Sequence, residues 1–394
     1  MSSEANFTVQ ACTQPAHVLP AGRKHLVLLG AGHAHVHVLQ GLAGPASAGL
    51  KITVVTPHLR QLYSGMVPGF VAGHYRLDEC VIPLGKLLIQ CGARLIQSSA
   101  AKLDANAQTV TLANGDTLSY DYLSLNTGPV MDRHRIESQM PGARKHALFV
   151  RPIESFAQLW PRVLDRAKRQ KIHLAVVGAG AAGLELAMAA AYALRGPGCA
   201  AGSRVTLVTG GQAPGAAYPV VTRHRIAKAL EHLRVEVLLD ACIDMSSGQI
   251  GLASGAKLAC DLPILAVGAQ APAWLASSGL ALDAQGFAQV NTFQQSTSHA
   301  AVFAAGDVAS RVDAPHAKSG VYAVRAGPPL LANLLSALNS QPLAAYQPQG
   351  RTLYLLSCGG KQAIAAWGGF SMQGAWVWRW KNRIDRRFVA TYGA

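Results

Sequence analysis

Two glycine-rich segments of the chain have the residue types and the spacing that bind a pyrophosphate. Gly30-Ala31-Gly32-His33 follows the apolar run at 25–29, and residues 178–183 follow the apolar run at 172–177. A buried strand, a tight glycine turn and a helix together present backbone N–H groups and a helix N-terminus to a phosphate anion. Two such segments predict two dinucleotides, and a protein that holds two usually moves electrons between them.

The first fingerprint departs from the full pattern at its third glycine. His35 stands where that glycine normally allows close packing of helix and strand. We therefore expect a looser turn, or an imidazole that faces outward. By spacing alone, His33, His35 and His37 look like a metal cluster. On a helix only His33 and His37 would share a face, so we expect no metal site.

Three further elements complete the pattern. The apolar run at 301–305 ends in Gly306-Asp307, which lets a backbone N–H and one carboxylate approach a ligand closely. Strand-like segments at 120–128 and 258–268 follow the two fingerprints, and each ends in a turn of small residues. The order of these elements predicts two similar nucleotide-binding folds, with the second inserted into the first.

This order of motifs resembles the two-dinucleotide (FAD and NAD(P)H) pyridine nucleotide oxidoreductase superfamily, and the resemblance covers nearly everything after residue 23. Within it, the chain is similar to the type II NADH dehydrogenases and the sulfide:quinone reductases. It resembles more closely the NADH-dehydrogenase-like flavoproteins fused to, or encoded near, selenide, water dikinase. The segments that carry this closer resemblance are 63–69, 320–325 and 378–388.

The length of 394 residues exceeds one hydrophobic core. Together with the motifs it predicts an α/β architecture of two Rossmann-like nucleotide-binding domains and a small C-terminal α+β module. The expected segments are a disordered leader at 1–23, an FAD-binding domain at 24–130 and 271–345, an NAD(P)H-binding domain at 131–270, and a module with an amphipathic helix at 346–394.

The resemblance places FAD on the first fingerprint and on the Gly-Asp element. The residues that it brings to FAD are Gly30, Ala31, Gly32, His33, Thr56, Pro57, Tyr63, Ser64, Gly65, Met66, Thr127, Gly128, Gly306, Asp307, Lys318, Gly320 and Val321. Thr56-Pro57 stand where an acid normally binds the adenosine ribose, so a hydroxyl or a backbone group must replace it. Lys318, or the N-terminus of the helix near Gly320, would stabilise anionic reduced flavin as a catalytic element.

The second fingerprint is complete, with Gly178, Gly180 and Gly183, and we expect it to bind NADH or NADPH as substrate. Glu185 matches a glutamate that lies near nicotinamide and quinone in type II NADH dehydrogenases. The alternative is a first-turn glutamate that the helix dipole favours. The strand at 204–209 ends without an acid, and Arg204, Arg223 or Arg225 could meet a 2′-phosphate. The choice between NADH and NADPH stays open.

The seven cysteines form no Cys-x-x-Cys motif, which argues against a redox-active disulfide on one turn and against a structural zinc site. Sulfide:quinone reductases use a cysteine in the region of Cys358. They also need a partner cysteine just before the second fingerprint, and residues 131–171 contain none. The sequence therefore disfavours sulfide oxidation by that mechanism.

The formal charge of +15 attracts anionic surfaces, and the densest basic cluster lies at 379–387. On a helix, Trp376, Trp380, Ile384 and Phe388 would share one face, with arginines beside it. This pattern suits an anionic membrane interface, or a helix packed on the protein itself or on the second subunit of a homodimer. No apolar run reaches about 18 residues. We expect a cytoplasmic protein, with peripheral attachment to the inner face of the cell membrane as the alternative.

These patterns together predict hydride transfer from NAD(P)H to FAD, followed by transfer to an acceptor, for which a quinone is the leading choice. One alternative acceptor is a sulfur or selenium compound. Another alternative is a non-enzymatic, flavin-containing nucleic-acid-binding protein. The basic residues before Arg379 are scattered, and aromatic residues do not alternate with them, which disfavours a nucleic-acid interface.

Overall fold

Two parallel sheets of five strands form the two halves of the molecule. The computed structural model describes residues 23–393, so the predicted leader at 1–23 lies outside the described residues except for Arg23. The first sheet has the order β19-β9-β1-β2-β5. Its strands are β1 (His25–Leu29), β2 (Lys51–Val55), β5 (Arg94–Ile96), β9 (Tyr122–Leu125) and β19 (Val302–Ala304). Because β19 joins this sheet from beyond the second one, the second fold is inserted into the first, as predicted.

The second sheet repeats the arrangement with the order β10-β17-β11-β12-β13. Its strands are β10 (Leu148–Phe149), β11 (His173–Val177), β12 (Arg204–Val208), β13 (Glu236–Leu238) and β17 (Leu262–Leu265). The central strands β1 and β11 are buried along their whole length. Helices cover parallel sheets on both faces, which is why these strands are continuous apolar runs rather than alternating ones.

Each fold also carries a small antiparallel sheet of three strands. It precedes β9 in the first fold and β17 in the second. In the first it comprises β6 (Ala100–Asp104), β7 (Thr109–Leu112) and β8 (Thr117–Ser119), and in the second β14 (Cys242–Ser246), β15 (Gln249–Leu252) and β16 (Lys257–Ala259). Two strand pairs complete the first half: β3 (Arg60–Leu62) with β4 (Val81–Pro83), and β18 (Ala288–Val290) with β20 (Ala309–Arg311).

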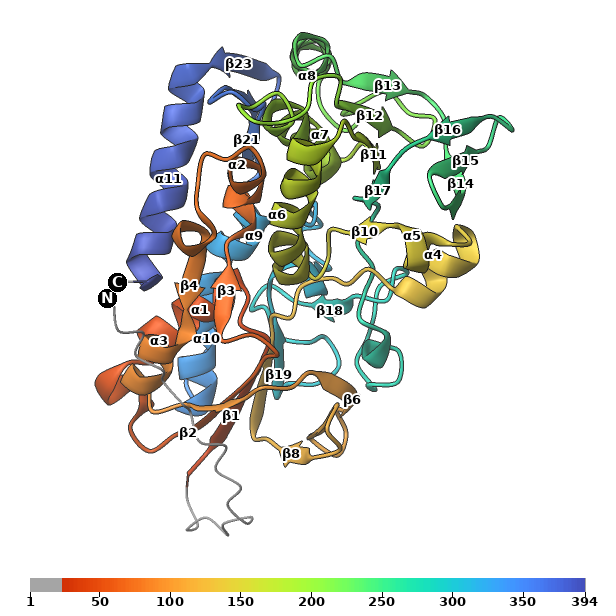
Figure 1. Ribbon diagram of the computed structural model, residues 1–394. Helices are drawn as coiled ribbons and strands as arrows, with labels where there is room; N and C mark the ends of the chain where they lie inside the picture. The colour runs from red at the N-terminus through yellow and green to blue at the C-terminus, as the bar shows by residue number, and fades with distance from the viewer. Residues whose placement is uncertain (1–22, 394) are drawn as a thin grey trace, which may run out of the picture.

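Helices cover these sheets and connect the two folds (Figure 1). They are α1 (His33–Gly41), α2 (Val67–Val71), α3 (Leu84–Gln90), α4 (Arg133–Gln139), α5 (Ala143–His146), α6 (Ile153–Arg169), α7 (Ala181–Ala193), α8 (Val220–His232), α9 (Gly320–Arg325), α10 (Gly327–Leu338) and α11 (Ala375–Gly393).

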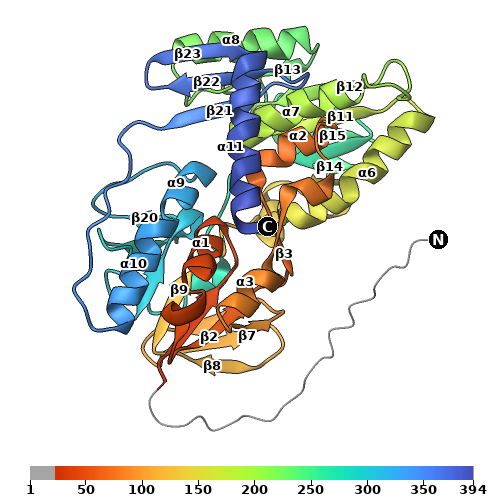
Figure 2. The same cartoon turned by 90° about the vertical axis from the view of Figure 1, so that its left-hand side faces the viewer.

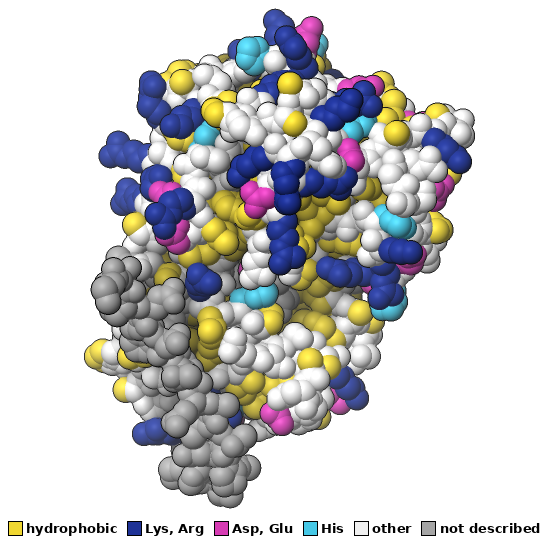
Figure 3. All heavy atoms as spheres, viewed as in Figure 1, with side chains coloured by type: hydrophobic (Ala, Val, Ile, Leu, Met, Phe, Trp, Pro, Cys, Tyr) yellow, Lys and Arg dark blue, Asp and Glu magenta, His cyan; other side chains and the backbone are white. Residues whose placement is uncertain are grey.

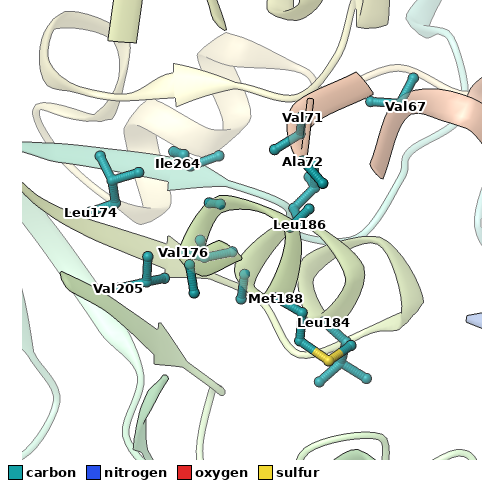
Figure 4. Close-up of a cluster of buried hydrophobic side chains, with 14 of the residues drawn as sticks. Val67, Val71, Ala72, Leu174, Val176, Leu184, Leu186, Met188, Val205 and Ile264 are labelled. Atoms are coloured by element: carbon teal, nitrogen blue, oxygen red, sulfur yellow. The ribbon is translucent and has the colours of Figure 1, made fainter. Parts of the chain in front are cut away.

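The short helix α2 belongs to the first fold by sequence, but it packs in the core of the second. Figure 4 shows Val71 and Ala72 beside Leu186 of α7, in the same buried cluster as strand residues such as Val176. The two folds therefore share a hydrophobic core, and burial of these side chains holds them together.

The C-terminal module is an antiparallel sheet followed by one long helix. The strands are β21 (Leu353–Ser357), β22 (Ala363–Trp367) and β23 (Phe370–Gly374). Helix α11 leaves this sheet and runs along the molecule until it contacts β4 and α1 of the first fold (Figure 2). The module thus contacts both nucleotide folds.

Candidate functional site

Asn126 organises the first glycine turn. Its Oδ1 accepts hydrogen bonds from the N–H groups of Ala34 and His35, and its Nδ2 donates to the carbonyl of Ala305 at 2.6 Å. A Cβ at Gly30 would lie 2.6 Å from the Asn126 carbonyl, and Gly30 has a φ of +83°. Only glycine satisfies both conditions. The Asn126 side chain therefore joins the glycine turn to the ends of β9 and β19.

His35 does not loosen this turn, and its imidazole does not face outward, so both expectations for it are wrong. The ring is fully buried, with Nδ1 2.6 Å from the Gly30 carbonyl and Nε2 2.8 Å from the Ser124 hydroxyl. Burial lowers the pKa of His35 to about 4, so the ring is neutral. A hydrogen-bonded histidine replaces the third glycine as the link between helix and strand.

The loop at 63–66 lies against the first fingerprint, as its place in the predicted FAD site requires. The Tyr63 ring is 5.2 Å from the His33 ring and 4.6 Å from that of Phe388 in α11. Ser64 Oγ lies 3.4 Å from His33 Nε2. The Met66 side chain is buried in the hydrophobic core, so only its backbone is free to approach a ligand.

The Gly-Asp element carries a partly buried carboxylate that no hydrogen-bond donor within residues 23–393 approaches. Burial raises the pKa of Asp307, against the opposing charges of Arg151 and Lys318. The buried Ser319 hydroxyl, just before α9, also lacks a partner in the described part of the chain. Two unpaired polar groups beside a glycine turn fit the hydroxyl and phosphate groups of a dinucleotide.

Lys318 is already engaged within the protein. Its ammonium donates to the Ala309 carbonyl at 2.5 Å and lies 3.9 Å above the centre of the Phe287 ring. Gly320 and Val321 form the first turn of α9 rather than the loop before it. The catalytic role of Lys318, like the contacts predicted for Thr56, Pro57, Thr127 and Gly128, stays a prediction.

We expect Asp307→Ala to weaken FAD binding about tenfold to a hundredfold, because a charge-assisted hydrogen bond contributes about 1.5–3 kcal/mol. The flavin that dialysis removes from the purified variant measures this loss. Asp116→Ala, which changes an exposed carboxylate in the turn between β7 and β8, is the matched control. Full flavin retention in Asp307→Ala would show that this carboxylate does not hold the cofactor.

The three glycines of the second fingerprint have different roles, because two lack room for a side chain and one is open to a ligand. A Cβ at Gly178 would lie 2.5 Å from the Ala266 carbonyl, and one at Gly183 would collide with the Gly178 carbonyl. Gly180 is exposed, and a Cβ there would meet nothing within 4 Å. Gly178 and Gly183 thus serve the fold, whereas Gly180 leaves space above the N-terminus of α7 for a pyrophosphate.

The structure narrows the candidates for a 2′-phosphate contact. Arg204 begins β12, whereas a nucleotide lies at the carboxyl end of such a strand, so Arg204 is at the wrong end. Arg223 and Arg225 lie on α8, and the Nε atom of each is buried without a partner among the described residues. These two remain the candidates.

Glu185 is not a solvent-exposed first-turn glutamate, because it contacts the C-terminal module. Its Oε1 accepts a hydrogen bond of 2.7 Å from the backbone N–H of Ser357. Burial raises the pKa of Glu185 to about 7, although Lys381 and the Ser357 N–H both act to lower it. A carboxyl group with this pKa exchanges a proton near neutral pH.

Lys381 and Asp385, which are not among the predicted site residues, extend this cluster. The Lys381 ammonium donates to Asp385 Oδ2 and to the Gly65 carbonyl, both at 2.6 Å. Burial, together with the nearby Asp385 carboxylate, raises the pKa of Tyr63. The only signal in the sequence is the i, i+4 spacing of a lysine and an aspartate on an arginine-rich helix.

A protein-family comparison identifies this architecture. The family described as "Pyridine nucleotide-disulphide oxidoreductase" matches residues 24–327. The chain belongs to this family. It is a flavin-dependent oxidoreductase of a family that binds FAD and a pyridine nucleotide. Its two fingerprints, described above, are the places where the residues fit these two nucleotides.

Curated relatives and solved structures agree with this family assignment. An NADH dehydrogenase-like protein of Mycobacterium tuberculosis is 29% identical over 282 residues, which is 68% of this chain and 69% of the relative. The sulfide:quinone oxidoreductase structure from Aquifex aeolicus has a TM-score of 0.77 at 17% identity, over 94% of this chain and 91% of that one. NDH2 from Plasmodium falciparum in complex with NADH has a TM-score of 0.70 at 13% identity, over 94% and 99%. The structures show the same fold.

Proposed function

We propose that the protein transfers a hydride from NADH or NADPH to FAD and passes the electrons on to a quinone. Support comes from relatives whose names include NADH dehydrogenase-like protein and, over 27% of this chain at 31% identity, sulfide-quinone reductase. The bound flavin supplies the chemistry that joins a two-electron donor to such an acceptor. The predicted link to selenide, water dikinase stays a prediction.

The observation that carries this proposal is the buried acid–base cluster of Glu185, Lys381 and Asp385. A quinone that takes up two electrons also takes up two protons, so its site needs a proton donor. Glu185, with a pKa of about 7, is suited to this role, and Ser357 joins it to the C-terminal module. The Lys381 ammonium donates a hydrogen bond to the Gly65 carbonyl in the loop at 63–66. This bond places the cluster beside the first fingerprint.

Anaerobic mixing tests the proposal in two steps. NADH or NADPH should bleach the absorbance of the bound flavin, and the faster of the two identifies the preferred donor. A short-chain quinone added next should restore the absorbance within the turnover time. Bleaching without restoration by any quinone would contradict the quinone step while leaving the first step intact.

The C-terminal module also presents an apolar surface, here called the outer face. It comprises six exposed side chains: Trp367, Phe370, Met372, Trp376, Trp380 and Ile384. Phe370 is 68% exposed and Trp376 47% exposed. A hollow of about 410 Å³ lies on this face, between the sheet and Trp380. Apolar patches of this kind are characteristic of interaction surfaces.

We propose that the outer face binds an anionic membrane, where a quinone is available. Arg379, Arg383 and Arg387 lie on the same helix, and each arginine near such a surface contributes about 1 kcal/mol. The prediction that Phe388 shares this exposed face is wrong, because its ring packs inward against Tyr63 and His33. Within residues 23–393 no helix is long and apolar enough to cross a membrane. A homodimer stays a prediction.

We expect the double variant Trp376→Ser/Trp380→Ser to bind anionic vesicles about a hundredfold more weakly, since burial of one large side chain contributes about 1.5–3 kcal/mol. Vesicle flotation at several salt concentrations measures this, and rising salt should weaken binding of the native chain. Deletion of the helix is unsuitable, because Val377, Lys381 and Asp385 on its other face are buried. Ile89→Ser, at an exposed isoleucine outside the outer face, is the control. Equal flotation of all three proteins would end the membrane proposal.

Sulfide oxidation, the alternative function, would require Cys358 to react as a thiolate. This thiol is buried, and burial together with Glu185 raises its pKa to about 12, so it is not a thiolate at neutral pH. We expect Cys358→Ser to keep its FAD content and to be reduced by NADH at the native rate. A stopped-flow trace of flavin bleaching measures this. An inactive variant with normal flavin content would restore the thiol mechanism.

A further inference from the structure

A second hollow, of about 920 Å³, lies at the far end of α7 from the dinucleotide fingerprint, and we call it the basic pocket. The C-terminal ends of α2, α6, α7 and α8 converge there with the β21–β22 turn. Helix α7 is thirteen residues long, which separates the pocket from Gly180 by about 20 Å. The pocket is therefore distinct from the fingerprint at the other end of the helix.

The lining of the basic pocket is cationic. It includes Lys168, Arg195, His232, Arg234 and Lys361, and none of the described residues that line it is acidic. Lys168 pairs with Asp165 outside the pocket. Arg195, Arg234 and Lys361 form no ion pair within the described part of the chain. On the face of the molecule that Figure 3 draws, Lys and Arg side chains outnumber Asp and Glu side chains over the upper half.

Helix dipoles account for only part of this charge. Lys168, Arg195 and His232 lie at or just beyond the C-terminal ends of helices, where cations are favourable in any protein. Arg234 and Lys361 need another explanation, because their backbones have φ values of +45° and +55°. Glycine or asparagine is preferred at such positions, just after a helix or in a hairpin turn. Cationic side chains stand there despite a conformational cost, which is typical of functional positions.

Two aromatic side chains, His74 and Tyr192, line the basic pocket. The His74 ring lies 5.4 Å from the Tyr192 ring and 5.5 Å from the Trp378 ring. Both of its ring nitrogens are buried and have no partner among residues 23–393. Burial and the charge of Lys361 lower the pKa of His74.

We propose that the basic pocket binds a nucleoside phosphate, with the base beside His74 and Tyr192 and the phosphates across Arg195 and Arg234. The volume lies within the range of about 300–1,000 Å³ that is usual for small-molecule sites. Arg195 and Arg234 repel each other, and a bound dianion relieves that repulsion. This site is additional to the FAD and NAD(P)H sites and does not depend on the quinone proposal.

Calorimetric titration of the FAD-loaded protein with ADP tests this site. We use the Gly180→Val background, in which the second fingerprint should be closed to nucleotides. ADP should still bind to this variant, in the basic pocket. Adding Arg195→Ala should weaken that binding about tenfold, as expected for the loss of a charge-assisted hydrogen bond. Lys257→Ala, at an exposed lysine of β16, should leave it unchanged. Absence of ADP binding in the Gly180→Val background would overturn the proposal.

Two further arms distinguish the source of the phosphate and the role of the strained backbone. A short-chain phosphatidylglycerol that binds in an Arg195-dependent manner, in place of ADP, would overturn the nucleoside assignment in favour of a lipid headgroup. Arg234→Gly should lower ADP affinity and at the same time melt no lower than the native chain, because glycine relieves the positive φ. Ser340→Gly, at a φ of +57° outside the pocket, should share the thermal effect and keep ADP affinity. Unchanged ADP affinity in Arg234→Gly would also contradict the site.

Discussion

Gly180→Val is expected to slow reduction of the flavin by NADH about a thousandfold while leaving the fold and the FAD content intact. The backbone at Gly180 has a φ of −71°, which valine adopts readily, and the space around its Cβ is empty. The branched side chain would instead occupy the place of the pyrophosphate at the N-terminus of α7. Loss of two or three charge-assisted hydrogen bonds, ~4 kcal/mol in sum, corresponds to about a thousandfold slower reduction.

Stopped-flow measurement of flavin bleaching at subsaturating NADH gives this ratio directly. The informative control is Gly178→Val at the first glycine of the same turn. There the φ of +116° and the nearby Ala266 carbonyl should prevent normal folding, so the variant should melt earlier or fail to accumulate. Native reduction rates in Gly180→Val would mean that the nicotinamide nucleotide does not use this turn.

Glu185→Gln is expected to slow reduction of the acceptor about 10²- to 10⁴-fold, the usual contribution of a general acid, while flavin reduction by NADH continues. With a pKa of about 7, Glu185 is protonated below neutrality, so the native acceptor rate should fall as the pH rises through about 7. The glutamine variant should show no such dependence. Steady-state rates with a short-chain quinone between pH 5 and 9 (about two units on either side of that pKa) measure both effects.

The same carboxyl group should affect stability. Its pKa in the folded protein lies above the ordinary value of 4.5, so the protonated form is favoured by folding. The stability contribution is present below about pH 4.5 and is lost as the pH rises through about 7. The melting temperature of Glu185→Gln should therefore depend less on pH than that of the native chain.

The kinetic prediction has its own contradicting outcome. An unchanged rate of acceptor reduction in Glu185→Gln would show that Glu185 is not the proton donor.

Local patterns allowed the sequence to predict both nucleotide folds, because an apolar strand followed by a glycine turn involves neighbouring residues. The prediction failed where a partner came from far along the chain. His35 was expected either to loosen the turn or to face outward, but its ring is buried and meets Ser124 of β9. Lys381 and Asp385 were not selected as site residues, because Lys381 finds its partner, the Gly65 carbonyl, 316 positions away in the chain. Strand β23, between glycines, lacked a pattern long enough to distinguish it from a turn.

The position of β19 affects how the chain is made. A ribosome releases β9 and β1 long before residues 302–304, so the first sheet must wait for its last strand. Until then β9 is an edge strand, with Leu123 and Leu125 open to pairing with other chains. The second sheet has all five strands by residue 265 and can assemble during this interval against α2, already synthesised. The inserted fold therefore has all its strands before the first fold does, and β19 completes the first sheet at an edge that is open until then.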